Sequence, residues 1–227
     1  MPRVNIVAEG QTEEAFVNEL LGPALYGLGV YPTARLAGKP KRRGGVTSYG
    51  SVKRDVLLAL KQDRNAYCST MLDYYRLPRD FPGLAMRSDH PAQEKARIIE
   101  RALHDDIAKA LGDSFDPNYF IPYIQMHEYE GLLFSDPLRL AEGIYRPDLA
   151  RAFAEIRRAF STPEDIDDGD DTAPSKRILD LCRGYAKPIH GVLAAIEIGI
   201  VAIRRECPHF DQWVTELEAL GQEQRQA

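Results

Sequence analysis

Apolar and polar residues alternate along the first 126 residues in a pattern that predicts strands and helices in turn. Short apolar runs bounded by turn residues predict strands, and apolar residues at helical spacing predict amphipathic helices. The predicted strands cover residues 3–8, 31–36, 66–72 and 119–126, and the predicted helices cover 12–27, 51–63 and 91–111. This order favours an α/β fold in which about four mostly parallel strands carry helices on both faces.

The remaining residues have the pattern of a helical C-terminal part. Helices are predicted from Asp136-Pro137 onward and over 147–160, 175–183, 192–206 and 210–220. An acidic loop is predicted at 163–171, and its run from Asp165 to Asp171 is expected to be a solvated turn. We therefore expect an α/β core over 1–135, a helical extension packed on that core over 136–220, and a frayed tail over 221–227.

Composition fits a folded protein with one substantial core, since 44% of the 227 residues are hydrophobic and 28% are charged. No stretch approaches the roughly 20 apolar residues of a membrane span, and the first residues lack a signal-peptide pattern. The three cysteines are scattered, which favours a reducing cytoplasm over a disulfide framework. We therefore expect a cytoplasmic protein that does not enter the membrane.

The formal net charge of −5 argues against non-specific electrostatic binding of nucleic acid by the surface as a whole. Any such binding needs a local basic patch, and the segment GKPKRRGG offers one in Lys39, Lys41, Arg42 and Arg43. The alternative is that these side chains belong to a solvated loop.

Acidic residues follow the predicted strands where ligands bind in open parallel sheets, at the carboxyl ends. Glu9 follows the first strand, Asp73 follows the third, and Glu128 and Glu130 follow the fourth. Carboxylates gathered in this way repel one another unless a cation lies between them. The sequence therefore predicts a site for Mg²⁺, with Mn²⁺ able to substitute.

Glu13 is a further candidate ligand. It lies four residues after Glu9, in the first turn of the predicted helix, and could point back toward it. The alternative is that Glu13 only complements the positive end of the helix dipole.

These acidic segments resemble a TOPRIM domain, the fold shared by topoisomerases, primases and old-lysogenization-defect (OLD) nucleases. The segments that carry the resemblance are IVAEGQTEEAF, MLDYYRLP and HEYEGLLF, together with KPIHG and CPHF. Their order is similar to that of a small TOPRIM-like family whose members are often encoded beside AAA or ABC-type ATPases in bacteria. The resemblance implies a magnesium-dependent nuclease with Glu9, Asp73 and Glu130 in the acidic site.

The resemblance also implies partners. It implies that the substrate is DNA or RNA and that an ATPase subunit works with the chain in defence or repair. A homodimer is left open.

Further along the chain, the resemblance carries a catalytic lysine to Lys187 in KPIHG, where a cation could stabilise charge on the phosphate or leaving oxygen. His190, one helical turn later, could orient Lys187 or donate to phosphate, and a capping role is equally open. Lys176 is a second candidate for phosphate binding. Each lysine has the alternative of a solvated surface position.

One departure from the TOPRIM pattern bears on the chemistry. Tyr75 stands at the second acid of the DxD motif, and a neutral phenol is a poor ligand for magnesium. Asp80 in the same loop could substitute. Tyr75, Tyr74 and Phe81 could stack bases or could simply pack the loop. A binding or effector module with little catalysis is therefore the alternative function, whereas the small size argues against a primase-like polymerase.

Overall fold

The structure is a computed structural model that describes residues 1–38, 48–86, 90–113, 115–166 and 172–226, with the backbone alone for 223–226. Its strands are β1 (Arg3–Ala8), β2 (Tyr31–Leu36), β3 (Tyr67–Asp73), β4 (Phe120–Ile121) and β5 (Ile124–Gln125). The strand order is β2-β1-β3-β4, β5 also pairs with β3, and every pairing in the described sheet is parallel. The predicted α/β class is confirmed.

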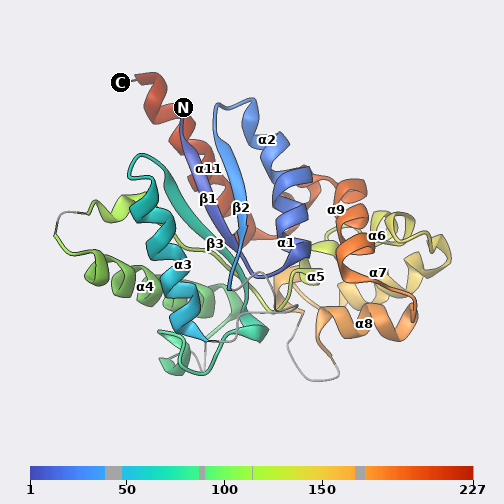
Figure 1. Cartoon of the computed structure of the whole chain (residues 1–227). Coiled ribbons are helices and arrows are strands. Elements are labelled where there is room, and N and C mark those ends of the chain that lie inside the picture. The colour runs from blue at the N-terminus through green and yellow to red at the C-terminus, as the bar shows by residue number, and fades with distance from the viewer. Residues whose placement is uncertain (39–47, 87–89, 114, 167–171, 227) are drawn as a thin grey trace.

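Helices cover both faces of the sheet (Figure 1). The N-terminal helices are α1 (Gln11–Phe16), α2 (Gly22–Tyr26), α3 (Tyr49–Gln62) and α4 (Ala92–Leu111), and a π-helical turn, η1 (Val17–Leu21), joins α1 to α2. The predicted helix at 12–27 is therefore one helical segment with a π turn inside it.

The central strand β1 is buried on both of its faces, as expected in a parallel sheet between two helical layers. Val4 and Ile6 pack into a core with α1, η1 and α2, whereas Val7 packs into a second core with α3 and α4. This division follows from right-handed crossovers, because the chain leaves β1 toward one edge of the sheet and returns past it to β3.

The C-terminal half is helical and packs against the α1 side. Its α-helices are α5 (Glu130–Leu133), α6 (Pro137–Gly143), α7 (Ala150–Arg158), α8 (Pro174–Leu181), α9 (Val192–Ile198), α10 (Ile200–Glu206) and α11 (Pro208–Gln226). A second π-helical turn, η7 (Lys187–Gly191), precedes α9, and 3₁₀ turns occupy Tyr74–Arg76, Leu84–Met86, Pro117–Tyr119, Pro147–Leu149 and Pro163–Asp165.

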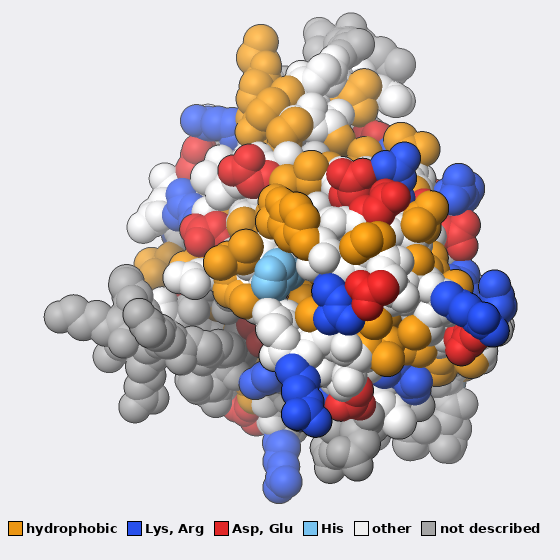
Figure 2. Space-filling view, turned by 90° about the vertical axis from the view of Figure 1, so that its right-hand side faces the viewer, with side chains coloured by type: hydrophobic (Ala, Val, Ile, Leu, Met, Phe, Trp, Pro, Cys, Tyr) orange, Lys and Arg blue, Asp and Glu red, His pale blue; other side chains and the backbone are white. Residues whose placement is uncertain are grey.

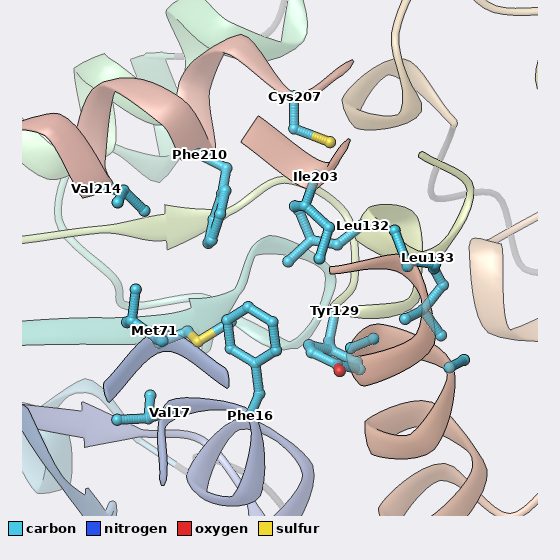
Figure 3. Packing of buried hydrophobic residues seen from close by; sticks show 14 of the residues in the cluster. Phe16, Val17, Met71, Tyr129, Leu132, Leu133, Ile203, Cys207, Phe210 and Val214 are labelled. Carbon is cyan, nitrogen blue, oxygen red and sulfur yellow. The ribbon is translucent and has the colours of Figure 1, made fainter. Parts of the chain in front are cut away.

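These helices have no core separate from that of the sheet. Phe16 of α1, Met71 of β3, Ile203 of α10 and Phe210 of α11 lie in one apolar cluster (Figure 3). The rings of Phe16 and Phe210 meet edge to face with their centroids 5.9 Å apart. The helical part is therefore built onto the sheet.

The prediction of one continuous fourth strand at 119–126 was wrong, because two short strands, β4 and β5, stand there. Pro122 interrupts them, since proline has no N–H to donate to a ladder. The Thr70 hydroxyl takes the place of the missing ladder bonds: it accepts from the N–H of Tyr123 and donates to its carbonyl oxygen, both at 2.9 Å.

Two features of the C-terminal half also differ from the predictions. The helix predicted at 192–206 breaks at Gly199, whose φ of 81° only glycine adopts readily. The last helix continues to Gln226, so the tail expected to be frayed is helical that far. Glu164 directly precedes the run from Asp165 to Asp171 that is expected to be a solvated turn. It is buried and accepts hydrogen bonds from the N–H groups of His209 and Phe210 at 2.9 Å each.

The face formed by the C-terminal helices mixes apolar and charged side chains (Figure 2). Arg139 of α6 binds Glu197 of α9 at 2.5 Å, and Ile189 and Val201 are 62% and 76% exposed on neighbouring segments. Within the part of the chain that the structure describes, no helix has the length and apolarity needed to cross a membrane.

Candidate functional site

The sheet has a topological switch point between β1 and β3. The chain leaves β1 for β2 on one side and leaves β3 for β4 on the other, so the helices that follow these two strands lie on opposite faces. Ligands in open α/β sheets bind in the crevice that such a reversal leaves at the carboxyl ends. Glu9 directly follows β1 and Asp73 ends β3, so both acids stand at this point.

Backbone hydrogen bonds hold these two carboxylates. The N–H of Asp73 donates to Glu9 Oε2 at 3.0 Å, and the N–H of Tyr129 donates to Asp73 Oδ1 at 2.9 Å. The ends of β1 and β3 and the loop after β5 are thus tied together through the side chains of the acids. Asp73 is only 5% exposed.

The loop after β5 folds back over the end of β3. His127 has a φ of 58°, which is uncommon for a residue with a side chain, and its carbonyl oxygen accepts from the N–H of Tyr75 at 3.0 Å. Tyr129 then turns its ring into the core against Phe16 (Figure 3). This anchoring places Glu128 and Glu130, which flank Tyr129, beside the ends of the strands with 2% and 1% exposure.

Lys187 reaches the same place from the turn η7. Its Nζ lies 2.9 Å from Glu130 Oε2 and 3.5 Å from Glu128 Oε1, and Glu128 also accepts from the N–H of Ser175 at 2.9 Å. His190 caps the turn from within, because its Nδ1 accepts from the N–H of Ala186 at 2.8 Å. The capping role that the sequence left open for His190 is therefore the one observed.

Burial and mutual repulsion raise the pKa values of three carboxyl groups of the site. Burial raises the pKa of Glu9 to about 7, Glu13 adds to the rise, and the N–H of Asp73 and the charges of Arg76 and Lys187 oppose it. Burial, followed by the charges of Glu9, Glu13 and Glu130, raises the pKa of Asp73 well above its usual range. Burial likewise raises the pKa of Glu13.

The pKa of Lys187 is raised, whereas the pKa of a buried cation without partners is lowered. Burial alone would lower the pKa of Lys187, but the negative charges of Glu130, Glu128 and Asp73 outweigh burial and raise it. The pKa of Glu130 is raised, because the effect of burial outweighs the opposing charge of Lys187. Lys187 is therefore held protonated at neutral pH and can act through its charge.

The donor chemistry suits a magnesium ion that keeps most of its water. Among the described residues, no group of three or more His, Cys, Asp or Glu side chains is arranged to hold a metal ion. Magnesium sites in proteins often use one or two carboxylates, with waters and substrate phosphates completing the shell. Glu9 and Asp73, joined through the Asp73 N–H, match this smaller set of ligands.

The outcome differs among the other predicted residues. Lys176 is exposed on the first turn of α8, and the basic segment Lys39, Lys41, Arg42 and Arg43 lies outside the described residues. Asp80, considered as a substitute ligand, accepts instead from the N–H of Tyr49 at 3.4 Å, at the start of α3. Tyr74 and Phe81 are buried, as the alternative that these rings pack the loop predicts, whereas Tyr75 is 36% exposed.

Three groups near the carboxylates were not predicted from the sequence. Arg76, three residues after Asp73, lies close enough for its charge to lower the pKa of Glu9. The Tyr185 hydroxyl donates to Glu130 Oε1 at 3.4 Å, and the backbone of Ser175 binds Glu128. Arg76 could have been noted from its place beside a strand-end acid, whereas the partners of Glu130 and Glu128 are more than 45 residues away along the chain.

Comparisons with known proteins place the chain in a family without assigning its chemistry. No functionally curated protein matches it. The C-terminal region of the OLD protein of Xanthomonas campestris pv. campestris is similar over 100% of this chain and 99% of that chain, with 17% identity and a TM-score of 0.42. A similarity of that size carries no argument about function. The family model described as "Domain of unknown function (DUF4276)" matches residues 8–218, and the chain therefore belongs to the DUF4276 family.

Proposed function

We propose that the chain is a magnesium-dependent nuclease that hydrolyses phosphodiester bonds of DNA or RNA at this acidic site. The observation that carries the proposal is the meeting of Glu9, Asp73 and Glu130 with Lys187 at the switch point of the sheet. Ordinary packing does not require several buried carboxyl groups beside one lysine, and perturbed pKa values of this kind cluster at functional sites.

Each residue has a role that follows from its surroundings. Glu9 and Asp73 would hold Mg²⁺, with Glu13 close enough to bind an outer water. When bound there, Mg²⁺ would place positive charge beside the scissile phosphate and lower the pKa of a coordinated water. The N–H groups of Asp73 and Tyr129 fix the orientation of the two carboxylates, so that little reorganisation is needed.

Lys187 supplies the cation of the site. Its raised pKa keeps it protonated, so it would stabilise negative charge on the phosphate or on the leaving oxygen. A bound phosphate would compete for Lys187 with Glu130 and Glu128, which hold it in the absence of substrate. The ATPase partner implied by the sequence resemblance is part of this proposal and rests on that resemblance alone.

The second candidate function is a binding or effector module that keeps this fold with little catalysis. Two observations favour it: Tyr75 stands where a second acid is expected, and Lys187 already neutralises part of the acidic cluster.

The two functions differ in metal binding and in cleavage. Isothermal titration of Mn²⁺ into the purified chain, into Glu9→Gln and into Asp73→Asn measures the first. Incubation with single- and double-stranded DNA and RNA, with and without the neighbouring ATPase, measures the second. A nuclease binds Mn²⁺ and loses cleavage in both variants, whereas Glu155→Gln, an exposed acid on α7, leaves both unchanged. Absence of cleavage on every substrate, with or without the ATPase, would favour the binding module.

A further inference from the structure

A hollow of about 240 Å³ lies at the opposite edge of the sheet from the acidic site. It is bounded by the connection from α3 to β3 and by the connection from α4 to β4, so it lies at the amino ends of these strands. β3 is 7 residues long, which separates the hollow from Asp73 by roughly 20 Å. The hollow is therefore independent of the acidic site.

Two exposed cations, Lys61 and Arg64, line the hollow. Within the described part of the chain, neither forms an ion pair or a hydrogen bond through its side chain. Their neighbours are engaged: Arg3 binds Asp63 at 2.9 Å and Lys53 binds Asp106 at 2.6 Å. The two free cations can therefore accept an external anion.

Among the described residues that line the hollow, one is acidic, and its carboxylate already accepts a hydrogen bond. Asp116 Oδ1 accepts from the N–H of Asn118 at 3.0 Å, where it caps the turn Pro117–Tyr119. With two cations against this one acid, the lining carries a net charge of +1. The electrostatics of the hollow therefore favour an anion over a cation.

Aromatic rings form another part of the lining. Tyr119 and Phe115 line the hollow, and the Tyr119 ring stacks on Tyr67 with centroids 4.7 Å apart and planes 17° apart. Leu60 and Leu111 add apolar surface. A fixed aromatic ring beside apolar side chains suits a planar ligand, because base–aromatic stacking contributes about 1–3 kcal/mol.

We propose that this hollow binds one nucleotide unit, with its base against Phe115 and Tyr119 and its phosphate at Lys61 and Arg64. The volume lies just below the roughly 300 Å³ at which pockets for drug-sized ligands begin, so it fits one ring system and leaves the sugar and phosphate toward solvent. The same chemistry is offered by a free mononucleotide and by a nucleotide within a single strand.

The test measures binding to the full chain in EDTA, so that cleavage plays no part and a failure of the proposed nuclease activity stays separate. The probes are adenosine 5′-monophosphate, uridine 5′-monophosphate, inorganic phosphate and a fluorescein-labelled, six-nucleotide single-stranded DNA. The variants are Lys61→Gln/Arg64→Gln and Phe115→Ala. The control, Arg158→Gln/Arg183→Gln, removes two exposed arginines from the C-terminal half.

We expect saturable binding of the nucleotide probes, weakened at least about tenfold by Lys61→Gln/Arg64→Gln and by Phe115→Ala, and unchanged in the control. A single strand that binds more tightly than the monophosphates identifies nucleic acid as the source, and the reverse order identifies a free nucleotide. The proposal is overturned if inorganic phosphate binds as tightly as the nucleotides, if the Lys61/Arg64 variant binds like the wild type, or if nothing binds.

Discussion

At the scale of single residues, the acidic site combines more carboxyl groups than cations. Lys187 pairs with Glu130 and Glu128, whereas Glu9 and Asp73 lie together and each accepts a hydrogen bond from a backbone N–H group. Burial and mutual repulsion make it unfavourable for Glu9 and Asp73 to ionise in the folded state, and their pKa values are therefore raised. The metal-free protein therefore gives up stability at the place where a metal would bind.

The stability of the metal-free protein should fall as pH rises through this titration. The pKa of Glu9 is about 7 in the folded chain and 4.5 for the ordinary group, so the folded state binds the proton more tightly than the unfolded state. The contribution of Glu9 to stability is fully present below pH 4.5 and is lost as pH rises through about 7. Each pKa unit between the folded and the unfolded state corresponds to about 1.4 kcal/mol in the free energy of unfolding.

Glu9→Gln tests this directly. The Gln side chain keeps an oxygen for the Asp73 N–H but cannot ionise. We expect the melting temperature in EDTA to exceed that of the wild type at pH 8, by roughly 2–4 °C per kcal/mol recovered, and the difference to vanish near pH 4.5. Thermal melts followed by circular dichroism at several pH values measure this. A difference that stays constant with pH would contradict the ionisation argument, and Glu155→Gln is the matched control.

Lys187→Met separates catalysis from substrate binding. A cation that stabilises charge growing in the transition state lowers the barrier without tightening the ground state. We expect single-turnover cleavage to fall on the order of 100- to 1000-fold while substrate affinity stays nearly unchanged. Removing the lysine also leaves Glu130 buried without its partner, so the rates are compared at a temperature where circular dichroism shows both proteins folded.

The charge-preserving variant Lys187→Arg should retain more cleavage activity than Lys187→Met. Loss of affinity at an unchanged saturated rate would instead make Lys187 a phosphate anchor. If neither the cleavage rate nor the substrate affinity changes, Lys187 is a surface lysine without a role in the reaction, and Lys176 becomes the better candidate for the functional lysine.

The residues of the site were predictable to different extents. Glu9 and Asp73 follow from the rule that ligands meet the carboxyl ends of parallel strands, and Lys187 came only from the family resemblance. Tyr185 could not be predicted, because its hydroxyl meets Glu130 across 55 residues of sequence. Such contacts depend on how helices dock, which apolar periodicity does not specify.

At the scale of elements, the π-helical turn η7 carries Lys187 to the carboxylates and is fixed by its other end. The Tyr129 hydroxyl donates to the carbonyl oxygen of Gly191 at 3.1 Å. A Cβ added at Gly191 would lie 2.9 Å from the Tyr185 hydroxyl and 3.3 Å from Cε1 of Tyr129. This position therefore requires glycine for close approach, and it couples the turn to the site.

Gly191→Ala should disturb the site through this turn. The added methyl group would displace the Tyr185 hydroxyl from Glu130 and shift Lys187, so we expect a loss of about 1–3 kcal/mol in stability and a fall in cleavage. Gly184→Ala is the control, because a Cβ there meets nothing within 4 Å. Denaturant unfolding and cleavage rates of both variants measure the effect. If the two variants behave alike, the turn is less tightly docked than its contacts indicate.

In the α/β core, elements with a regular apolar pattern were predicted to within about two residues, and those with a local interruption were not. The last helix runs six residues past its predicted end, from Leu220 to Gln226. β1 and β2 have the predicted bounds, and β3 is displaced by one residue. The fourth strand failed at Pro122, where a side chain from a neighbouring strand, Thr70, replaces the ladder. The π turns were not predicted, because they lie within or beside helical patterns that α-helix explains equally well.

At the scale of the whole molecule, α11 fastens the C-terminal half to the sheet. Trp213 stacks on Tyr123 with centroids 4.2 Å apart, and its Nε1 donates to the Ser69 hydroxyl at 2.9 Å. The first turn of α11 is held by Glu164, which accepts hydrogen bonds from the N–H groups of His209 and Phe210. The predicted core over 1–135 and the extension over 136–220 therefore share one apolar interior.

This shared interior predicts that residues 1–135 do not fold alone. Without α11, the sheet face that carries Val4 and Ile6 and the helix that carries Phe16 would expose apolar surface that the full chain buries. The isolated fragment should unfold without a cooperative transition, and its proton NMR spectrum should show little chemical-shift dispersion. The full chain should unfold in one transition. Mixing the fragment with residues 136–227 should restore both properties, since the missing helices then cover the exposed face. A fragment that unfolds cooperatively near the melting temperature of the full chain would show instead that the sheet, α3 and α4 suffice, and that the C-terminal helices serve the site alone.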